Sequence, residues 1–309
     1  MRIVLTTVLI CISIADCLSQ NIEKIIFNEA DANNGYYLAV QPSKKEIEGV
    51  LVLLPGFGQT PESIFPESKI QNVAYLHNIL TIAIAGGRKL YADDSVIENL
   101  NQAFEHVKMT YSVGSDEFVI GGFSAGGTIA LRYGEYCIDR SQEAAILPKG
   151  VFTVDSPVDL FDIWNYFQRE IKKSYSEAGS GEAKFVSEIM IKEIGDPINE
   201  RDNYSRLTPF NADLEYPGNE KFLKNMSVRV YHDVDIVWQL QNRRRSLFDS
   251  NALAASELIN RLLLLGNQNA EFMSAKQPGY RSAGFRHPHS WSIVDEVELM
   301  QWVKKNLKK

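Results

Sequence analysis

A serine flanked by glycines is the residue of this chain best suited to nucleophilic chemistry. The segment Gly122-Phe123-Ser124-Ala125-Gly126 has the pattern Gly-x-Ser-x-Gly, which alone is a weak signal. Its context makes it informative, because an apolar run ends at Gly121 and a helical pattern begins at Thr128. A sharp turn between a strand and a helix strains its central residue and exposes the side chain above the sheet. Ser124 is therefore the predicted nucleophile for attack on a carbonyl carbon.

The same turn also predicts a group that stabilises negative charge. The first N–H groups of a helix have no partner within the helix. The N–H of Ala125 is therefore expected to face the oxyanion that forms when the Ser124 hydroxyl attacks a carbonyl. Glycine is expected on both sides of the turn because a larger residue would collide with the strand or the helix.

The elements that must position this turn are visible as short apolar runs between helix-length polar segments. Continuous apolarity is typical of strands buried on both faces, and the alternation with helices predicts an α/β fold with a mainly parallel sheet. Residues 22–28 and 35–41 flank an Asp-Ala-Asn-Asn-Gly turn and predict an antiparallel hairpin at the sheet edge. The runs are 49–54, 80–85, 117–121, 150–154, 228–231 and 270–275, and the clearest helical patterns are 95–110, 128–138 and 295–307.

One interval between predicted strands is much longer than the others. Residues 160–224 are rich in helical patterns and aromatic side chains, with a Gly-Ser-Gly sequence at 179–181 that predicts a helix break. We interpret this interval as a helical cap inserted into a single domain.

With the Gly-x-Ser-x-Gly turn placed between a strand and a helix, the chain resembles the α/β-hydrolases over nearly all of residues 20–309. The resemblance implies a mainly parallel central sheet flanked by helices. It also implies a Ser-Asp-His triad in the chain order nucleophile, acid, histidine. The second oxyanion donor follows from Pro55-Gly56-Phe57-Gly58, where relatives often have His-Gly-x-Gly. Phe57 is the predicted source of this backbone N–H, and Gly58 is the alternative.

The resemblance places the catalytic histidine beyond the last strand. Two histidines lie there, in Arg286-His287-Pro288-His289-Ser290-Trp291, and a predicted helix follows. His289 is the predicted base because relatives often have a small residue and an aromatic residue directly after it, and His287 is the alternative. His232, at the end of the run 228–231, is interpreted as shaping a turn.

The acid is expected after the run 228–231, in His232-Asp233-Val234-Asp235. Asp235 fits the position at which relatives have this residue, and Asp233 is an alternative. Asp155, after the run 150–154, is another, because some α/β-hydrolases take the acid from that strand. The residues show no metal-binding spacing such as His-Glu-x-x-His, and acyl transfer by such a triad needs no metal or cofactor.

These residues predict an exported serine hydrolase that cleaves carboxylic esters, with a small-molecule or carbohydrate-linked ester as its substrate. A secreted peptidase of the prolyl-oligopeptidase type is an alternative, although a chain of this length has no room for the propeller domain usual in that family. A non-catalytic binding protein on the same fold is the other alternative. Three neighbouring arginines, Arg243 to Arg245, are interpreted as a solvated helix face, and a carboxylate-binding role is the alternative.

The N-terminus predicts export. Arg2 precedes an apolar run at 3–14, which is shorter than the roughly 20 residues that span a bilayer but suits a signal peptide. Cys17 and Ser19 are small residues at the −3 and −1 positions of a cut before Gln20, so residues 1–19 are the predicted signal peptide and 20–309 the mature, secreted or periplasmic domain. Lipoprotein anchoring at Cys17 is disfavoured by Asp16 directly before it. Cleavage leaves Cys137 without a disulfide partner.

Composition excludes several classes of protein. With 45% hydrophobic and 23% charged residues, the 309-residue chain is ordinary globular protein, not a disordered, collagen-like or coiled-coil chain. The formal net charge of −7 argues against a nucleic-acid partner, which favours a basic face. No run after the N-terminus is apolar enough to insert stably into a membrane.

Overall fold

The computed structural model describes residues 20–42, 44 and 46–308, and within them a single mixed sheet forms the centre of the molecule. The eight strands lie in the order β1-β2-β4-β3-β5-β6-β7-β8. The pairs β1–β2 and β2–β4 are antiparallel and the other five pairs are parallel. The strands are β1 Ile22–Ile26, β2 Tyr36–Val40, β3 Gly49–Leu54, β4 Ile79–Ile84, β5 Phe118–Phe123, β6 Gly150–Val154, β7 Ser227–His232 and β8 Ala270–Ser274. The predicted signal peptide, with Cys17, lies outside the described residues.

The sheet confirms the strands predicted from apolar runs. Each of the six runs forms a strand, and the N-terminal hairpin forms β1 and β2, with β1 at the sheet edge. Strands β2 to β7 are buried along their whole length, whereas the edge strands β1 and β8 are partly exposed. Helices on both faces of the sheet account for this burial, and hence for apolar runs that do not alternate with polar residues.

The helices between these strands follow the predicted pattern with one informative difference. The helix after the serine turn begins at Ala125, three residues before the predicted start, so Ser124 itself occupies the N-cap position. The helices are α1 Ile64–Glu67, α2 Ile70–Leu76, α3 Asp94–Tyr111, α4 Ala125–Asp139, α5 Leu160–Lys173, α6 Glu177–Glu193, α7 Arg201–Leu207, α8 Ile236–Arg243, α9 Asn251–Leu264 and α10 Glu296–Leu307.

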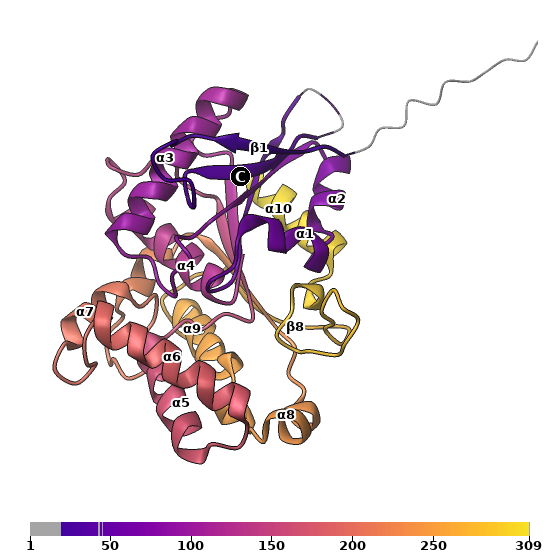
Figure 1. Cartoon of the computed structure of the whole chain (residues 1–309). Helices are drawn as coiled ribbons and strands as arrows, with labels where there is room; N and C mark the ends of the chain where they lie inside the picture. Colours follow the sequence, from indigo (N-terminus) through magenta and orange to yellow (C-terminus); the bar gives the residue numbers. More distant parts are fainter. Residues whose placement is uncertain (1–19, 43, 45, 309) are drawn as a thin grey trace, which may run out of the picture.

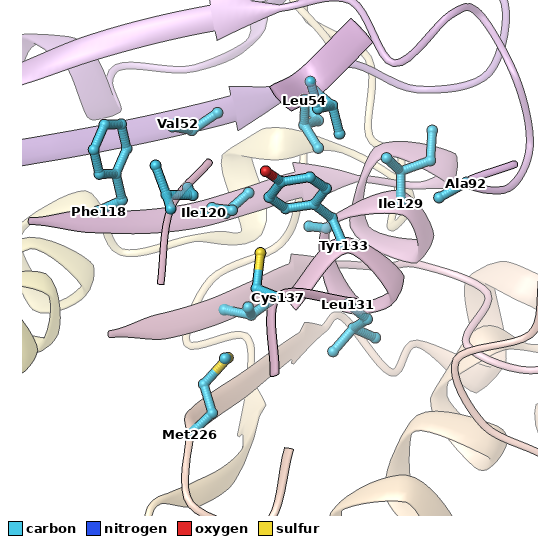
Figure 2. Close-up of a cluster of buried hydrophobic side chains, with 14 of the residues drawn as sticks. Val52, Leu54, Ala92, Phe118, Ile120, Ile129, Leu131, Tyr133, Cys137 and Met226 are labelled. Carbon is cyan, nitrogen blue, oxygen red and sulfur yellow. The ribbon is translucent and has the colours of Figure 1, made fainter. Parts of the chain in front are cut away.

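Two hydrophobic layers hold the helices to the sheet. Helices α3, α4 and α9 pack on one face, and α2 and α10 pack on the other (Figure 1). Figure 2 shows Tyr133 and Cys137 of α4 facing the strand residues Val52 and Ile120. Cys137 is buried and makes no disulfide within the described residues, and burial raises the pKa of its thiol to about 12. Cys137 is therefore a packing residue, as expected for a thiol that is neutral and shielded from solvent.

The interval between β6 and β7, for which the sequence predicts a helical cap, contains α5, α6 and α7 (Figure 1). The three helices share a third hydrophobic cluster, which also includes Leu90, Tyr91 and Ala125. The interval therefore packs against the residue that follows Ser124.

The predicted helix break at 179–181 is wrong. These residues lie in the first turns of α6, where the Ser176 side chain accepts a hydrogen bond from the Gly179 N–H at 3.0 Å. This N-cap satisfies an N–H that would otherwise lack a partner, so the helix starts despite two glycines. In the part of the chain that the structure describes, none of the helices combines the length and the apolarity that crossing a bilayer requires.

Candidate active site

The turn at Ser124 has the strained geometry that its sequence predicts. Ser124 adopts φ 53° and ψ −126°, a conformation that L-residues rarely adopt and that costs on the order of 1–3 kcal/mol. A Cβ atom at Gly122 would lie 2.1 Å from the carbonyl carbon of Gly126, and one at Gly126 would lie 2.3 Å from the carbonyl oxygen of Leu54. Both glycines are therefore required by close backbone contacts around the turn.

A carboxylate and two histidines meet beside this turn. Asp155 directly follows β6, the neighbour of β5, and its Oδ2 lies 2.7 Å from Nδ1 of His289. His289 belongs to the loop between β8 and α10, and its ring lies 4.5 Å, centroid to centroid, from that of Phe123. The other carboxylate oxygen of Asp155, Oδ1, lies 3.0 Å from Nδ1 of His232, the last residue of β7.

The charge state of Asp155 determines the direction of these hydrogen bonds. Burial favours a raised pKa for Asp155, but contacts with His289 and His232 outweigh it and hold the pKa of that carboxyl well below its usual range. A carboxylate only accepts hydrogen bonds, so Nδ1 of both histidines carries a hydrogen. In neutral His289, Nε2 is then the nitrogen that can accept a proton.

The expected contact between Asp235 and the histidine is wrong. Oδ2 of Asp235 lies 2.8 Å from Nη2 of Arg286, and its Oδ1 accepts a hydrogen bond from the Trp238 N–H at the start of α8. These contacts, first the backbone N–H and then the guanidinium, lower the pKa of Asp235. The carboxylate three residues beyond β7 thus caps a helix and binds an arginine, and Asp155 is the acid that meets His289.

Asp233, an alternative acid, makes contacts similar to those of Asp235. Its Oδ2 lies 2.8 Å from Nη1 of Arg286 and accepts a hydrogen bond from the Gly279 N–H. Arg286 directly precedes His287, so Asp233 and Asp235 together fix the histidine loop to the segment after β7.

His287, the alternative base, lies in surroundings unlike those of His289. Its Nε2 lies 3.1 Å from Nη2 of Arg243, and its Nδ1 accepts a hydrogen bond from the backbone N–H of His289. Burial, followed by the positive charges of Arg281, His289 and Arg243, lowers the pKa of His287 to about 4. No carboxylate in the described structure pairs with its ring, so His289 is the better candidate for the base.

The hydrogen bonds of the Pro55–Gly58 turn distinguish the two candidate oxyanion donors. The N–H of Gly56 donates to Oε1 of Gln59 at 2.9 Å, and the N–H of Gly58 points to the carbonyl of Arg88 at 3.4 Å. The Phe57 N–H makes no hydrogen bond within the described residues, and Phe57 lines the same cavity as Ser124. Phe57 and Ala125, the first residue of α4, thus remain the predicted donors.

A cavity of about 340 Å³ connects these groups with the cap. The Ser124 hydroxyl makes no hydrogen bond to His289 in the described structure, a contact that is often long before substrate binds. Figure 1 shows α5, α6 and α8 at the same end of the molecule. Besides Ser124, Asp155 and His289, the cavity is lined by Phe57, Leu90, Ile163, Tyr166, Phe167, Val186 and Trp238. Tyr166 and Phe167 are thus the cap aromatics that face the cavity.

His232 is the site residue that the sequence interpretation missed. It is buried, its ring stacks on Phe272 at 5.4 Å, and its Nε2 has no hydrogen-bond partner among the described residues. A signal was present in the sequence, because Asp155 and His232 each directly follow an apolar run and Ser124 lies three residues beyond another. In the sheet these are the adjacent strands β5, β6 and β7. Among the residues that the structure describes, no group of three or more His, Cys, Asp or Glu side chains could hold a metal ion.

Comparison with known proteins shows the fold. No family model and no curated protein matches the chain. Among solved structures, it is similar to FphF, a fluorophosphonate-binding serine hydrolase of Staphylococcus aureus, with 11% identity and a TM-score of 0.54 over 93% of this chain and 99% of that one. An S-formylglutathione hydrolase from Agrobacterium tumefaciens has 10% identity and a TM-score of 0.56 over 94% and 99%.

A third similar structure belongs to a longer chain. The acylaminoacyl peptidase of Pyrococcus horikoshii has 15% identity and a TM-score of 0.55 over 94% of this chain but only 42% of its own. The eight-stranded, mostly parallel sheet with flanking helices is therefore an α/β-hydrolase fold resembling that of esterases and other serine hydrolases.

Proposed function

We propose that the chain is a serine hydrolase that cleaves carboxylic esters through Ser124, Asp155 and His289. The observation that carries the proposal is the 2.7 Å contact between His289 Nδ1 and Asp155 Oδ2, beside a serine held at φ 53°. All three side chains line one cavity. The similarity to esterases supports the fold on which this chemistry would occur.

The proposed reaction is acyl transfer in two steps. Nε2 of His289 removes the proton from the Ser124 hydroxyl as its oxygen attacks the ester carbonyl, and Asp155 stabilises the resulting imidazolium. The N–H groups of Phe57 and Ala125 stabilise the negative charge on the carbonyl oxygen. His289 then protonates the leaving alcohol, and the acyl group remains on Ser124. Water, activated by the same histidine, releases the acid and restores the hydroxyl.

Replacement of the nucleophile tests the proposal. Ser124→Ala is expected to abolish hydrolysis of p-nitrophenyl acetate and covalent labelling by a fluorophosphonate. Ser95→Ala, which changes an exposed serine on α3, is the matched control and should keep both activities. Labelling of Ser124→Ala at the wild-type rate would refute Ser124 as the nucleophile.

Two kinds of substrate separate the ester hydrolase from the alternatives. The fold shared with an acylaminoacyl peptidase makes dipeptide anilides an informative comparison with esters. Faster turnover of anilides than of activated esters, corrected for their uncatalysed rates, would favour a peptidase. Binding of an ester without turnover or labelling would favour a binding protein. An ester panel of increasing acyl length, including acetylated and feruloylated sugars, would then define the substrate.

We also propose that the enzyme is secreted or periplasmic, on the pattern of residues 1–19. Expression of the full chain in an export-competent host, followed by N-terminal sequencing, is expected to give a mature protein that begins at Gln20. Recovery of the uncleaved chain inside the cell would contradict the proposed export.

A further inference from the structure

Arg243 is a positively charged side chain of the cavity that lacks an acidic partner. It is the last residue of α8, half-buried, and it lines the cavity that contains Ser124. Its guanidinium lies 5.6 Å from the centre of the Trp238 ring, and its Nη2 lies 3.1 Å from Nε2 of His287. Within the described residues, no carboxylate oxygen lies within 4.0 Å of it. A half-buried charge without an opposite charge is costly unless a ligand supplies one.

Most acidic residues around the cavity are already engaged, and the remaining one, Glu182 of α6, is exposed and makes no ion pair with Arg243 in the described structure. Asp155 pairs with two histidines, and both Asp233 and Asp235 pair with Arg286. Asp249 pairs with Arg169 and Lys173, each at 2.9 Å. Glu170 pairs with Arg245 at 3.1 Å. None of these carboxylates pairs with Arg243.

A second arginine adds positive charge to the same part of the cavity. Arg281 also lines it and lies over the Phe123 ring, 5.3 Å from the ring centre. Its nearest acidic contact, with Glu67, is 3.8 Å long. His287 lies near both arginines, and its pKa of about 4 reflects first its burial and then the charges of Arg281, His289 and Arg243. The cavity therefore has a positively charged wall beside the catalytic loop.

We propose that Arg243, assisted by Arg281, binds a negatively charged group on the substrate, so that the enzyme prefers esters that carry a carboxylate. This inference rests on the proposed function, because it assigns the substrate class of the same cavity. A guanidinium can donate two parallel N–H···O hydrogen bonds to a carboxylate, and this interaction is stronger than the one it makes with a neutral group. Trp238 stacks near the guanidinium and limits its orientations.

Paired substrates that differ only in charge test the inference. On the acyl side, the pair is mono-4-nitrophenyl adipate and 4-nitrophenyl hexanoate, and on the alcohol side it is 4-acetoxybenzoate and phenyl acetate. Arg243→Gln is expected to lower kcat/KM for at least one anionic ester by about tenfold or more, the effect of losing a charged hydrogen bond. The neutral ester of that pair should change by less than about threefold, and Arg243→Lys should restore part of the loss.

Arg244→Gln is the matched control, because Arg244 is the exposed neighbour, lies over Tyr175 and does not line the cavity. It should leave all four rates within about twofold of the wild type, since an exposed charge contributes little. Added salt should reduce kcat/KM for the anionic ester more than for the neutral one. An equal loss for both members of each pair in Arg243→Gln would overturn the inference and indicate that Arg243 only supports His287.

A binding experiment separates this inference from the proposed function. Monomethyl adipate should bind to Ser124→Ala, as measured by calorimetry, and should bind at least about tenfold more weakly to the double variant Ser124→Ala, Arg243→Gln. If the wild type hydrolyses no ester but this difference in binding is found, the anion site stands and the hydrolase proposal fails. If esters are hydrolysed but neither binding nor rate depends on Arg243, the anion site fails alone.

Discussion

Two groups of acidic residues lie at neighbouring strand ends, and their partners differ. Asp155, after β6, meets Nδ1 of His289 and of His232. Asp233 and Asp235, after β7, both meet Arg286 at 2.8 Å. An imidazole can exchange a proton near neutral pH, whereas a guanidinium stays charged. The first group can therefore support proton transfer, while the second fixes the loop that carries the histidines.

The comparison extends to the two histidines of that loop. His289 belongs to the Asp155 group, because its Nδ1 meets the carboxylate of Asp155. His287 contacts Arg243 and lies near Arg281. Burial is the largest cause of its lowered pKa, and these positive charges lower the pKa further. The two histidines are separated only by Pro288, yet one meets a carboxylate and the other a guanidinium. The partner of a side chain therefore decides its role, and its position in the chain does not.

The largest expected effect is a difference in activity between variants of these two histidines. His289→Gln is expected to reduce kcat for p-nitrophenyl acetate by about 10⁵-fold or more, because the base is lost. His287→Gln should reduce it by less than about tenfold, through a looser loop. Stopped assays would measure kcat for both variants, after circular dichroism has shown that each is folded. Comparable losses in the two variants would contradict the assignment.

A smaller effect is expected from the second histidine on Asp155. His232→Phe removes the donor to Oδ1 and frees the carboxylate to rotate, so kcat should fall by about tenfold. His232→Asn keeps an N–H donor and is expected to recover part of this loss. KM should change little in either variant, because His232 would position the acid and not the substrate. A normal kcat for His232→Phe would show that His289 alone suffices to orient Asp155.

The smallest expected effect is on the pH dependence of stability. The pKa of His287 is about 4 in the fold and 6.5 without it, so between these values the unfolded chain binds more protons. The free energy of unfolding should therefore fall as the pH decreases from 6.5 to 4, with a contribution from His287 on the order of 1–3 kcal/mol. Urea titrations of the wild type and His287→Gln at several pH values would measure it. Parallel profiles for the two proteins would contradict the low pKa.

Much of the fold could be predicted from the sequence, because local patterns determine it. The apolar runs gave every strand between β3 and β8, since burial on both faces requires continuous apolarity. The start of α6 could not be recognised from composition, because two glycines suggested a break and the Ser176 cap prevented it.

The site was only partly predictable, for a different reason. Ser124 and its glycines lie within five residues, so their geometry is local. Which of Asp155, Asp233 and Asp235 meets His289 depends on contacts with residues far along the chain. Arg286, next to His287, pairs with both Asp233 and Asp235. Such contacts produce no recognisable spacing pattern in the sequence, because a triad is defined by the three-dimensional geometry of its side chains.

The most direct test of Asp155 as the partner of His289 compares Asp155→Asn with Asp235→Asn. Both substitutions remove one negative charge with almost no change in volume, and both positions lie beside the same loop. Asp155→Asn is expected to lower kcat for p-nitrophenyl acetate by about 10⁴-fold, because His289 loses the group that fixes its tautomer and balances its charge. Asp235→Asn should lower kcat by less than about tenfold. A large loss in Asp235→Asn together with a nearly normal kcat in Asp155→Asn would show that Asp235, and not Asp155, supports the base.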